Sequence, residues 1–279
     1  MRLTGETRLL GVIGHPIAHS LSPRMHNASF AVTGLDYVYV PLEVRSDGLP
    51  TAVAGLATLG FRGFNVTMPH KVAILPLLDD VDAAAGISGA VNTVVVEGDR
   101  LLGINTDGPG FLAACEESGI VFGGASVLVV GAGGAAAAIA AAALGAGADH
   151  LNLLNRSGWR AEGLGRRLGR AYPTVNISVY GPDEVEKAAE GADVIVNATY
   201  LGMKDDDPPP VPPGCLADGM AVCDAVYRSG VETRLMRLAR ERGLPAVAGE
   251  RMLLYQGVQA QRLWTGKEPD VEAMSCVLS

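Results

Sequence analysis

A lysine and an aspartate, Lys71 and Asp107, each follow an apolar run of the kind that forms a buried strand. They lie in the stretches NVTMPHK and GINTDGPG. In a dry pocket, a lysine can give a proton to a carbonyl oxygen as negative charge develops there, and can take it back in the reverse direction. A nearby aspartate can orient the lysine or share that proton. We therefore expect Lys71 and Asp107 to act as an acid–base pair, although Asp107 alone could simply cap the next helix.

Further polar side chains lie where apolar runs end. In HPIAHSLSP, Ser20 and Ser22 are spaced to donate hydrogen bonds to a carboxylate, while Ser22, directly before Pro23, could instead cap a helix. Singly, each such residue is ordinary turn chemistry. In open α/β sheets, however, ligands bind beyond the carboxyl ends of the strands. The convergence predicts a ligand site there, made of Ser20, Ser22, Thr67, Lys71, Asn92 and Asp107.

A glycine-rich turn, VLVVGAGGAAAA at 127–138, follows an apolar run and opens an alanine-rich one. It fits the pattern G-x-G-x-x-A with Gly131, Gly133 and Ala136. In that pattern the first glycine makes the turn, the second lets the backbone approach a pyrophosphate, and the small third residue keeps the helix close to the sheet. The helix N-terminus adds free N–H groups and a partial positive charge. The strand–turn–helix context predicts a dinucleotide site rather than a tight turn without a ligand.

The end of the next predicted strand distinguishes between the two dinucleotides. NAD enzymes usually place an Asp or Glu there, on the ribose hydroxyls. This chain reads LLNRSGWR, with no acid before Glu162. The guanidinium groups of Arg156 and Arg160 can bind a 2′-phosphate through planar charged forks. We therefore expect NADP, held by Asn155, Arg156, Ser157 and Arg160; the alternative is that both arginines are solvated surface charges.

Strand-like and helical runs alternate along the whole chain, which predicts an α/β protein with parallel sheets covered on both faces. A new series of strands and helices begins after Gly123-Gly124. The length allows one large domain or two ordinary ones. Residues 91–96 and 101–104 flank a turn and read as a hairpin. Residues 69–78, which include Lys71, look helical.

The composition limits the classes of partner. The net charge is −8 and no basic run occurs, which argues against a nucleic-acid surface. The longest apolar region, 135–144, is too short to cross a bilayer, and residues 1–7 do not read as a signal peptide. The cysteines form no CxxC pair and the histidines lack clustered acids, so we expect no metal site. These features predict a cytoplasmic protein that acts on a small molecule, with no nucleic-acid or membrane partner.

Eight motifs occur in the order seen in shikimate dehydrogenases, which the chain resembles over nearly its whole length: HPIAHSLSP, NVTMPHK, GAVNT, NTDG, GAGGA, NRS, NAT and MLLYQ. The resemblance implies the reversible NADP-dependent reduction of 3-dehydroshikimate to shikimate, in aromatic amino-acid biosynthesis. It also implies an α/β fold of two domains, a substrate domain with a mixed sheet rich in parallel strands and a Rossmann domain that binds NADP, with the active site in the cleft between them. The implied ranges are 1–106 for substrate binding and catalysis, 107–248 for the Rossmann domain, and 249–279 for C-terminal helices that return to the first domain.

The resemblance also implies roles for particular residues. Lys71 and Asp107 would stand at the chemistry, Ser20 and Ser22 would bind the substrate carboxylate, and Tyr227 would lie near it. Further contacts to the ring hydroxyls would come from Thr67, Asn92 and Gln256. The pyrophosphate would lie on Gly131, Ala132, Gly133, Gly134 and Ala135, and the 2′-phosphate end on Asn155, Arg156, Ser157 and Arg160. The remaining cofactor contacts would be Thr199, Met203, Gly249 and Met252.

The chain departs from the family pattern at a few positions: His15, Tyr200, Ala248 and Arg251. Other functions stay open. A quinate or aminoshikimate dehydrogenase would be a near relative, and a folate-linked dehydrogenase also pairs a lysine with a Rossmann domain. A non-catalytic NADP-sensing protein would belong to another class, but it would need no proton donor such as Lys71. For the assembly we expect a monomer or a homodimer.

Overall fold

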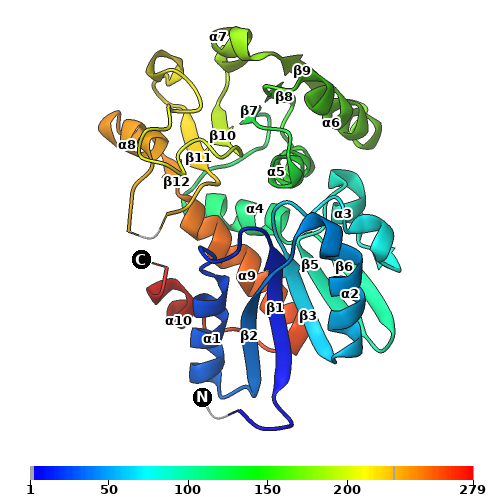
Figure 1. Ribbon diagram of the computed structural model, residues 1–279. Helices are drawn as coiled ribbons and strands as arrows, with labels where there is room; N and C mark the ends of the chain where they lie inside the picture. Colours follow the sequence, from blue (N-terminus) through cyan, green and yellow to red (C-terminus); the bar gives the residue numbers. More distant parts are fainter. Residues whose placement is uncertain (1–2, 229, 279) are drawn as a thin grey trace. The chain divides into compact units, whose positions relative to one another are not determined.

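The computed structural model describes residues 3–228 and 230–278. They form two compact units, each built around its own sheet (Figure 1). The first unit comprises Met1–Thr106 and Leu253–Ser279, and the second comprises Asp107–Met252. The chain therefore passes between the units twice, once where helix α4 (Asp107–Glu117) begins and once inside helix α9 (Gly249–Thr265).

The first unit contains a six-stranded mixed sheet in the order β2-β1-β3-β5-β6-β4. β1 is parallel to β2 and β3, β5 is antiparallel to β3 and β6, and β4 is parallel to β6. The strands are β1 (Arg8–Gly14), β2 (Tyr37–Glu43), β3 (Phe61–Val66), β4 (Asp80–Val81), β5 (Thr93–Glu97) and β6 (Arg100–Ile104). The helices, besides α9, are α1 (Ser22–Thr33), α2 (Leu49–Thr58), α3 (Ala83–Ser88), α10 (Val271–Cys276) and 3₁₀ turns at Ser46–Gly48 and Leu75–Leu77.

The two faces of this sheet are buried against different helices, because alternate residues of a strand point to opposite sides. On β1, Leu10 packs with Phe30 of α1 and with Trp264 of α9. Ile13 points the other way and packs with Val53 of α2. The sheet therefore has a core on each side, and its backbone is shielded from water, as parallel strands require.

Trp264 explains a glycine in the middle of β3. Its indole is 1% exposed and its Nε1 donates a hydrogen bond of 2.9 Å to the carbonyl oxygen of Val94. The ring lies so close to the sheet that a Cβ on Gly63 would come within 2.2 Å of Nε1. Gly63 therefore allows α9, from the end of the chain, to lie directly against β3 and β5.

The second unit contains a six-stranded sheet in the order β12-β11-β10-β7-β8-β9, and all its pairs are parallel. Its strands are β7 (Ser126–Val130), β8 (His150–Leu154), β9 (Asn176–Tyr180), β10 (Val194–Asn197), β11 (Ala221–Asp224) and β12 (Ala246–Val247). Its helices, besides α4, are α5 (Gly134–Gly145), α6 (Gly158–Ala171), α7 (Val185–Ala189), α8 (Arg234–Glu241) and 3₁₀ turns at Pro182–Glu184 and Pro213–Cys215. This is the Rossmann order, with its topological switch point between β7 and β10. The expected α/β class, with one mixed and one Rossmann sheet, is confirmed.

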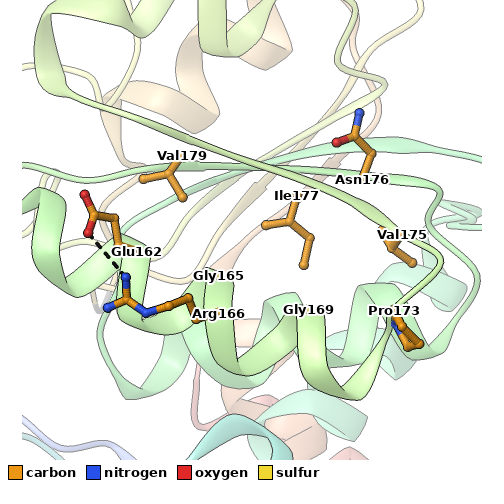
Figure 2. A pocket seen from close by; sticks show the side chains of 9 residues that line it. All are labelled: Glu162, Gly165, Arg166, Gly169, Pro173, Val175, Asn176, Ile177 and Val179. Carbon is orange, nitrogen blue, oxygen red and sulfur yellow. Dashed lines mark hydrogen bonds and ion pairs between the residues drawn. The ribbon is translucent and has the colours of Figure 1, made fainter.

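Close helix contacts in this unit depend on small residues. A Cβ on Gly108 of α4 would lie 3.1 Å from the Cβ of Ala142 and 3.2 Å from the carbonyl oxygen of Ala138, both on α5. At the edge strand β9, a Cβ on Gly165 of α6 would contact Val179 and Ile177. Figure 2 shows these two side chains facing that helix. Among the described residues, no helix is both long and apolar enough to cross a membrane.

The segment 69–78 is not the helix that its sequence suggested. It consists of turns and the 3₁₀ turn Leu75–Leu77, and β4 begins at Asp80. Pro69 and Pro76 lack the N–H groups that a continuous helix would use. The carbonyl oxygen of Lys71 instead accepts a 2.8 Å hydrogen bond from the N–H of Val91. Lys71 therefore lies on a turn that is attached to the segment leading into β5.

His26 is a buried titratable group in the core of the first unit. Its ring stacks on Tyr39 with the centroids 4.4 Å apart, and Nδ1 donates to Oε1 of Gln261 at 3.1 Å. Gln261 in turn donates from Nε2 to Oγ of Ser29, which orients the amide. Nε2 of His26 is also buried and has no hydrogen-bond partner within residues 3–228 and 230–278. Burial lowers the pKa of His26 from 6.5 to about 4, and the Gln261 hydrogen bond offsets only part of that effect.

We expect His26 to make the first unit less stable in acid. Because the folded-state pKa is about 4 and the ordinary value 6.5, the stabilisation is complete above pH 6.5 and declines as the pH falls toward 4. The loss by that pH is about 3 kcal/mol of unfolding free energy. Urea unfolding, followed by the fluorescence of the neighbouring Trp264, would measure it.

The matched variants are His26→Asn, whose amide can replace the Nδ1–H donor without titrating, and His150→Gln at an exposed histidine. His26→Asn lowers stability at every pH but flattens the profile, and His150→Gln leaves the slope unchanged. Differences between the wild-type and variant curves remove the contribution of other groups. A His26→Asn profile parallel to the wild type would contradict the assignment.

Candidate functional site

The turn that carries Lys71 is attached to the sheet at several points. The N–H of Thr67 donates to the carbonyl oxygen of Ile13, at 2.9 Å, where β1 ends. His70 is 1% exposed and donates from Nε2 to the carbonyl oxygen of Val44 at 2.6 Å. Together with the Val91 hydrogen bond, these contacts fix the backbone of the turn. The half-buried Lys71 side chain thus starts from a defined position beyond β3.

Ser22 does not have the role of helix cap that its position directly before Pro23 suggested. Helix α1 begins at Ser22, its cap position is Leu21, and no side chain caps it. The hydroxyl of Ser20 accepts a long hydrogen bond, 3.4 Å, from the N–H of Ser22. The Ser22 hydroxyl makes no hydrogen bond to any described residue although the residue is only 6% exposed. The interpretation of Ser22 as a cap was therefore wrong, and its hydroxyl is available to a ligand.

Asn92 is the centre of a buried hydrogen-bond network. Its side-chain oxygen accepts from the N–H of Thr106 at 2.7 Å, and its Nδ2 donates to Oγ1 of Thr106 at 2.9 Å and to Oε1 of Gln256 at 3.3 Å. Gln256 also donates from Nε2 to the carbonyl oxygen of Leu253 at 2.8 Å. Both the position of Asn92 and the orientation of the Gln256 amide are set by these bonds.

Three residues of this network were missed by the sequence argument. Asn65 donates from Nδ2 to the carbonyl oxygen of Asn92 and to Oγ1 of Thr93, both at 3.0 Å, and accepts from the hydroxyl of Tyr39 at 2.6 Å. An asparagine inside an otherwise apolar strand, two residues before Thr67, was the available signal. A buried amide needs such partners, so Asn65, Thr93 and Tyr39 support Asn92 from below.

These groups share one edge of the first sheet. β1 and β3 are parallel, and Ile13 near the end of β1 lies opposite Val66, the last residue of β3. β5 is antiparallel and starts where they end, with Thr93 opposite both Asn65 and Ile104. We call this set the polar edge: Thr67, Asn92, Thr106 and Gln256. It presents fixed hydroxyl and amide groups, which can bind a ligand rich in hydroxyls.

The glycine loop of the second unit leaves space where the pyrophosphate of a dinucleotide would bind. Gly131 has φ of +121°, and a Cβ there would lie 2.7 Å from the carbonyl oxygen of Ala198, so the fold itself requires this glycine. Gly133 is different, because a Cβ there would meet nothing within 4 Å. It is the N-cap of α5, whose first turn has no side-chain cap. The residues therefore fit a pyrophosphate, which would use the open space at Gly133 and the N–H groups at the start of α5.

The residues expected at the 2′-phosphate lie between β8 and α6. Asn155 donates from Nδ2 to the carbonyl oxygen of Ser157 at 2.9 Å, which shapes the turn before the helix. Arg156 and Arg160 are exposed, and neither has a carboxylate partner among the described residues. The nearest acid along the chain, Glu162, pairs with Arg166 at 3.5 Å (Figure 2). The donors of Arg156 and Arg160 are thus not occupied by an acid.

A second buried network, centred on Asn197, connects the loops after β10 and β11. Asn197 donates from Nδ2 to Oδ1 of Asp224 at 2.8 Å and accepts from the hydroxyl of Thr199 at 2.7 Å. Asp224 also accepts from the hydroxyl of Thr233 at 2.6 Å and from the N–H of Val226 at 3.0 Å. Burial raises the pKa of Asp224 to about 6 against these hydrogen bonds, which lower it. Thr199 was expected from the sequence, whereas Asn197 and Asp224, which both end apolar strands, were not.

Tyr227 and Asp107 interact within the second unit. Burial raises the pKa of Tyr227 to about 12, and the carboxylates of Asp107 and Glu250 add to the shift. The phenol therefore stays neutral and can donate a hydrogen bond. Asp107, the first residue of α4, is 4% exposed. A Cβ on Gly249 would lie 2.4 Å from the carbonyl oxygen of Val226, so this glycine allows α9 to start against the Tyr227 segment.

Arg251, which departs from the family pattern, has a partner in the same unit. Its Nε donates to Oε2 of Glu117 at 2.7 Å, and its Nη2 contacts the other carboxylate oxygen, so the pair is bidentate. The pair ties the start of α9 to the end of α4. Tyr200 is 62% exposed on the loop before Met203, which is 37% exposed. The departures from the family pattern at Arg251 and Tyr200 thus leave the residues of the Asn197 network unchanged.

The structure thus gathers the expected residues in two sets. The polar edge and Lys71 belong to the first unit, while the glycine loop, Asp107, Tyr227 and the arginines belong to the second. Pairing of Lys71 with Asp107 stays a prediction. Among the described residues, no group of three or more His, Cys, Asp or Glu side chains could hold a metal ion.

Residues 12–94 match the family described as shikimate dehydrogenase substrate binding domain, residues 115–202 match shikimate/quinate 5-dehydrogenase, and residues 249–275 match the shikimate 5′-dehydrogenase C-terminal domain. The chain is 60% identical to the shikimate dehydrogenase (NADP(+)) of Rubrobacter xylanophilus, over 100% of this chain and 98% of the relative.

Two solved structures extend the likeness to three dimensions. One is shikimate 5-dehydrogenase from Thermus thermophilus in complex with NADP(H) and shikimate, with a TM-score of 0.86 and 37% identity over 97% of this chain and 98% of that chain. The other is quinate dehydrogenase from Corynebacterium glutamicum in complex with NAD, with a TM-score of 0.88 and 36% identity over the same shares, 97% and 98%. The chain belongs to the shikimate dehydrogenase family.

Proposed function

We propose that the protein catalyses the reversible NADP-dependent reduction of 3-dehydroshikimate to shikimate. The observation that carries the proposal is the identity of 60% over the whole chain to an enzyme of that name. The polar edge agrees with such a substrate, which has one carboxylate and several hydroxyls on a ring. A steady-state assay of shikimate and quinate, each with NADP and NAD, tests it. Turnover confined to quinate would instead assign the sister activity.

In this function the first unit binds the substrate. Ser20 and Ser22 donate hydrogen bonds to its carboxylate, and the neutral phenol of Tyr227, a residue of the second unit, donates a further one. Thr67, Asn92 and Gln256 hold the ring hydroxyls. The Asn92 network keeps these amides in one orientation, so little conformational freedom is lost on binding.

In this function the second unit would hold NADP, whose reduced form would supply the hydride for the carbonyl carbon. Residues 131–135 cradle the pyrophosphate, and Asn155, Arg156, Ser157 and Arg160 hold the 2′-phosphate. The remaining cofactor contacts come from Thr199 and Gly249, with Met203 and Met252 near the nicotinamide. Thr199 lies on the loop that the Asn197 network fixes.

Lys71 and Asp107 carry the proton. As the carbonyl oxygen gains negative charge, the Lys71 ammonium gives it a proton and becomes a neutral amine; in the oxidation of shikimate, the amine takes the hydroxyl proton back. Asp107 accepts a hydrogen bond from the lysine or the substrate hydroxyl and keeps the two aligned. The same side chain thus gives the proton that completes the ring hydroxyl and accepts it in the reverse reaction.

A second candidate is the oxidation of quinate, favoured by the likeness to the Corynebacterium glutamicum structure. Quinate has an extra hydroxyl, so discrimination would rest on the groups around its carboxylate. Arg156 and Arg160 argue against the use of NAD, the cofactor of that complex, because NAD lacks the 2′-phosphate. A cytoplasmic location and a monomeric or homodimeric assembly remain predictions.

Replacing Lys71 by Met should remove the proton donor while keeping most of the side-chain volume. We expect kcat to fall by about 10²–10⁴-fold, the range typical of a positioned acid–base group, with the affinity for NADP little changed. Stopped-flow turnover and calorimetric titration with NADP would measure both. Lys267→Met, on an exposed lysine of the same unit, is the control. Near-wild-type kcat in Lys71→Met would rule out the assigned role.

Replacing Arg156 by Ala should weaken NADP more than NAD, because only NADP carries the 2′-phosphate. The expected loss is about tenfold in NADP affinity, as for one charge-assisted hydrogen bond. The ratio of kcat/KM for the two cofactors measures the selectivity directly. Arg170→Ala, at the far end of α6, removes the same charge away from the turn and should leave that ratio unchanged. Equal weakening of both cofactors would make Arg156 a general surface charge.

A further inference from the structure

Trp159 is an exposed aromatic residue for which the fold gives no packing role. Its side chain is 70% exposed in the first turn of α6, whereas the other tryptophan of the chain, Trp264, is 1% exposed in a core. A single exposed apolar residue is ordinary on a protein surface. Its position is less ordinary, because it stands between Arg156 and Arg160, the two residues expected at the 2′-phosphate.

The ring of Trp159 holds one of these arginines. The guanidinium carbon of Arg160 lies 5.1 Å from the ring centroid, within the range of a cation–π interaction, for which tryptophan is the strongest partner. An arginine side chain has many rotamers, and a contact that restricts them lowers the entropy lost when the fork binds an anion. Arg160 is thus held near its own helix turn before any ligand arrives.

The type of partner matters as much as the contact. A carboxylate would occupy the N–H donors of Arg160 and neutralise its charge, whereas an aromatic face leaves the donors and the charge available. The nearby acid, Glu162, is paired with Arg166 instead (3.5 Å, Figure 2). The segment 155–171 contains five arginines and one glutamate, so its net charge is 5 − 1 = +4 in a chain of net charge −8. An anion is attracted here although the protein as a whole is acidic.

We propose that Trp159 is a positioning residue for Arg160 and thereby a determinant of the preference for NADP over NAD. The proposal rests on the proposed function, in which Arg160 binds the 2′-phosphate. It assigns Trp159 no contact with the reacting atoms. The ring acts through Arg160 alone, so its removal should be felt only by the cofactor that carries the phosphate.

Calorimetric titration of the full-length protein with NADP and with NAD tests the proposal. Trp159→Ala should weaken NADP about two- to fivefold, the range expected for an exposed cation–π contact, and leave NAD within experimental error. Trp159→Phe keeps an aromatic face and should restore most of the affinity. In the double variant Trp159→Ala/Arg160→Ala, the loss should equal that of Arg160→Ala alone, because the ring has nothing left to hold.

Two controls separate this effect from general changes. Val121→Ala shortens another exposed apolar side chain of the same unit, and Arg170→Ala removes an arginine from the last turn of α6. Neither should alter the ratio of NADP to NAD affinity, and thermal unfolding should show all variants folded. Equal weakening of NADP and NAD by Trp159→Ala would overturn the proposal, since the ring would then contact a part that both cofactors share. Additive losses in the double variant would overturn it as well.

The wild-type protein distinguishes this proposal from the one on which it rests. If the wild type turns over shikimate with NADP but Trp159→Ala keeps the full preference, only the role of Trp159 fails. If the wild type shows no preference for NADP, the assignment of Arg156 and Arg160 fails and the positioning role fails with it.

Discussion

The buried side chain of Asn92 is the constraint on which the polar edge of the first unit depends. It is 2% exposed, so its oxygen and both its N–H groups need partners inside the protein. Thr106 and Gln256 supply them, and Asn65 fixes the neighbouring backbone. Because Gln256 lies on α9, which packs against the sheet through Trp264, the end of the chain is held in place by the same network that shapes the edge.

The second unit repeats this solution with different residues. Asn197 ends β10 and, with Asp224, connects two loops that apolar contacts alone would leave less defined. The carboxyl of Asp224 is so buried that its pKa rises to about 6 despite three donors. A partly satisfied buried network is costly, and a fully satisfied one specifies a single geometry. Both units thus use one buried asparagine at a strand end to set the loops beyond it.

The exposed end of the proposed cofactor site follows another principle. Arg156 and Arg160 must exchange water for a phosphate, so they cannot be buried or paired with acids in advance. The ring of Trp159 restricts Arg160 without neutralising it. Rigid, buried networks therefore stand where the substrate ring and nicotinamide are expected, and a loosely held, charged surface stands where the 2′-phosphate is expected.

The sequence by itself determined the fold class, the glycine loop and the family, because these depend on local periodicity and on motifs with fixed spacing. It indicated Gly131 and Gly133 together, but only the tertiary structure distinguished them. Ala198 requires the first, whereas a Cβ on the second would meet none of the described residues within 4 Å. Sequence also misread two local features, the helix at 69–78 and the cap role of Ser22, since the outcome depended on hydrogen bonds to Val91 and Ser20. Asn65, Asn197 and Asp224 were missed because each lies inside or at the end of an apolar strand and acts through partners distant in the chain. Such partners come together only when strands pair in a particular order, and that order was decided by the tertiary structure.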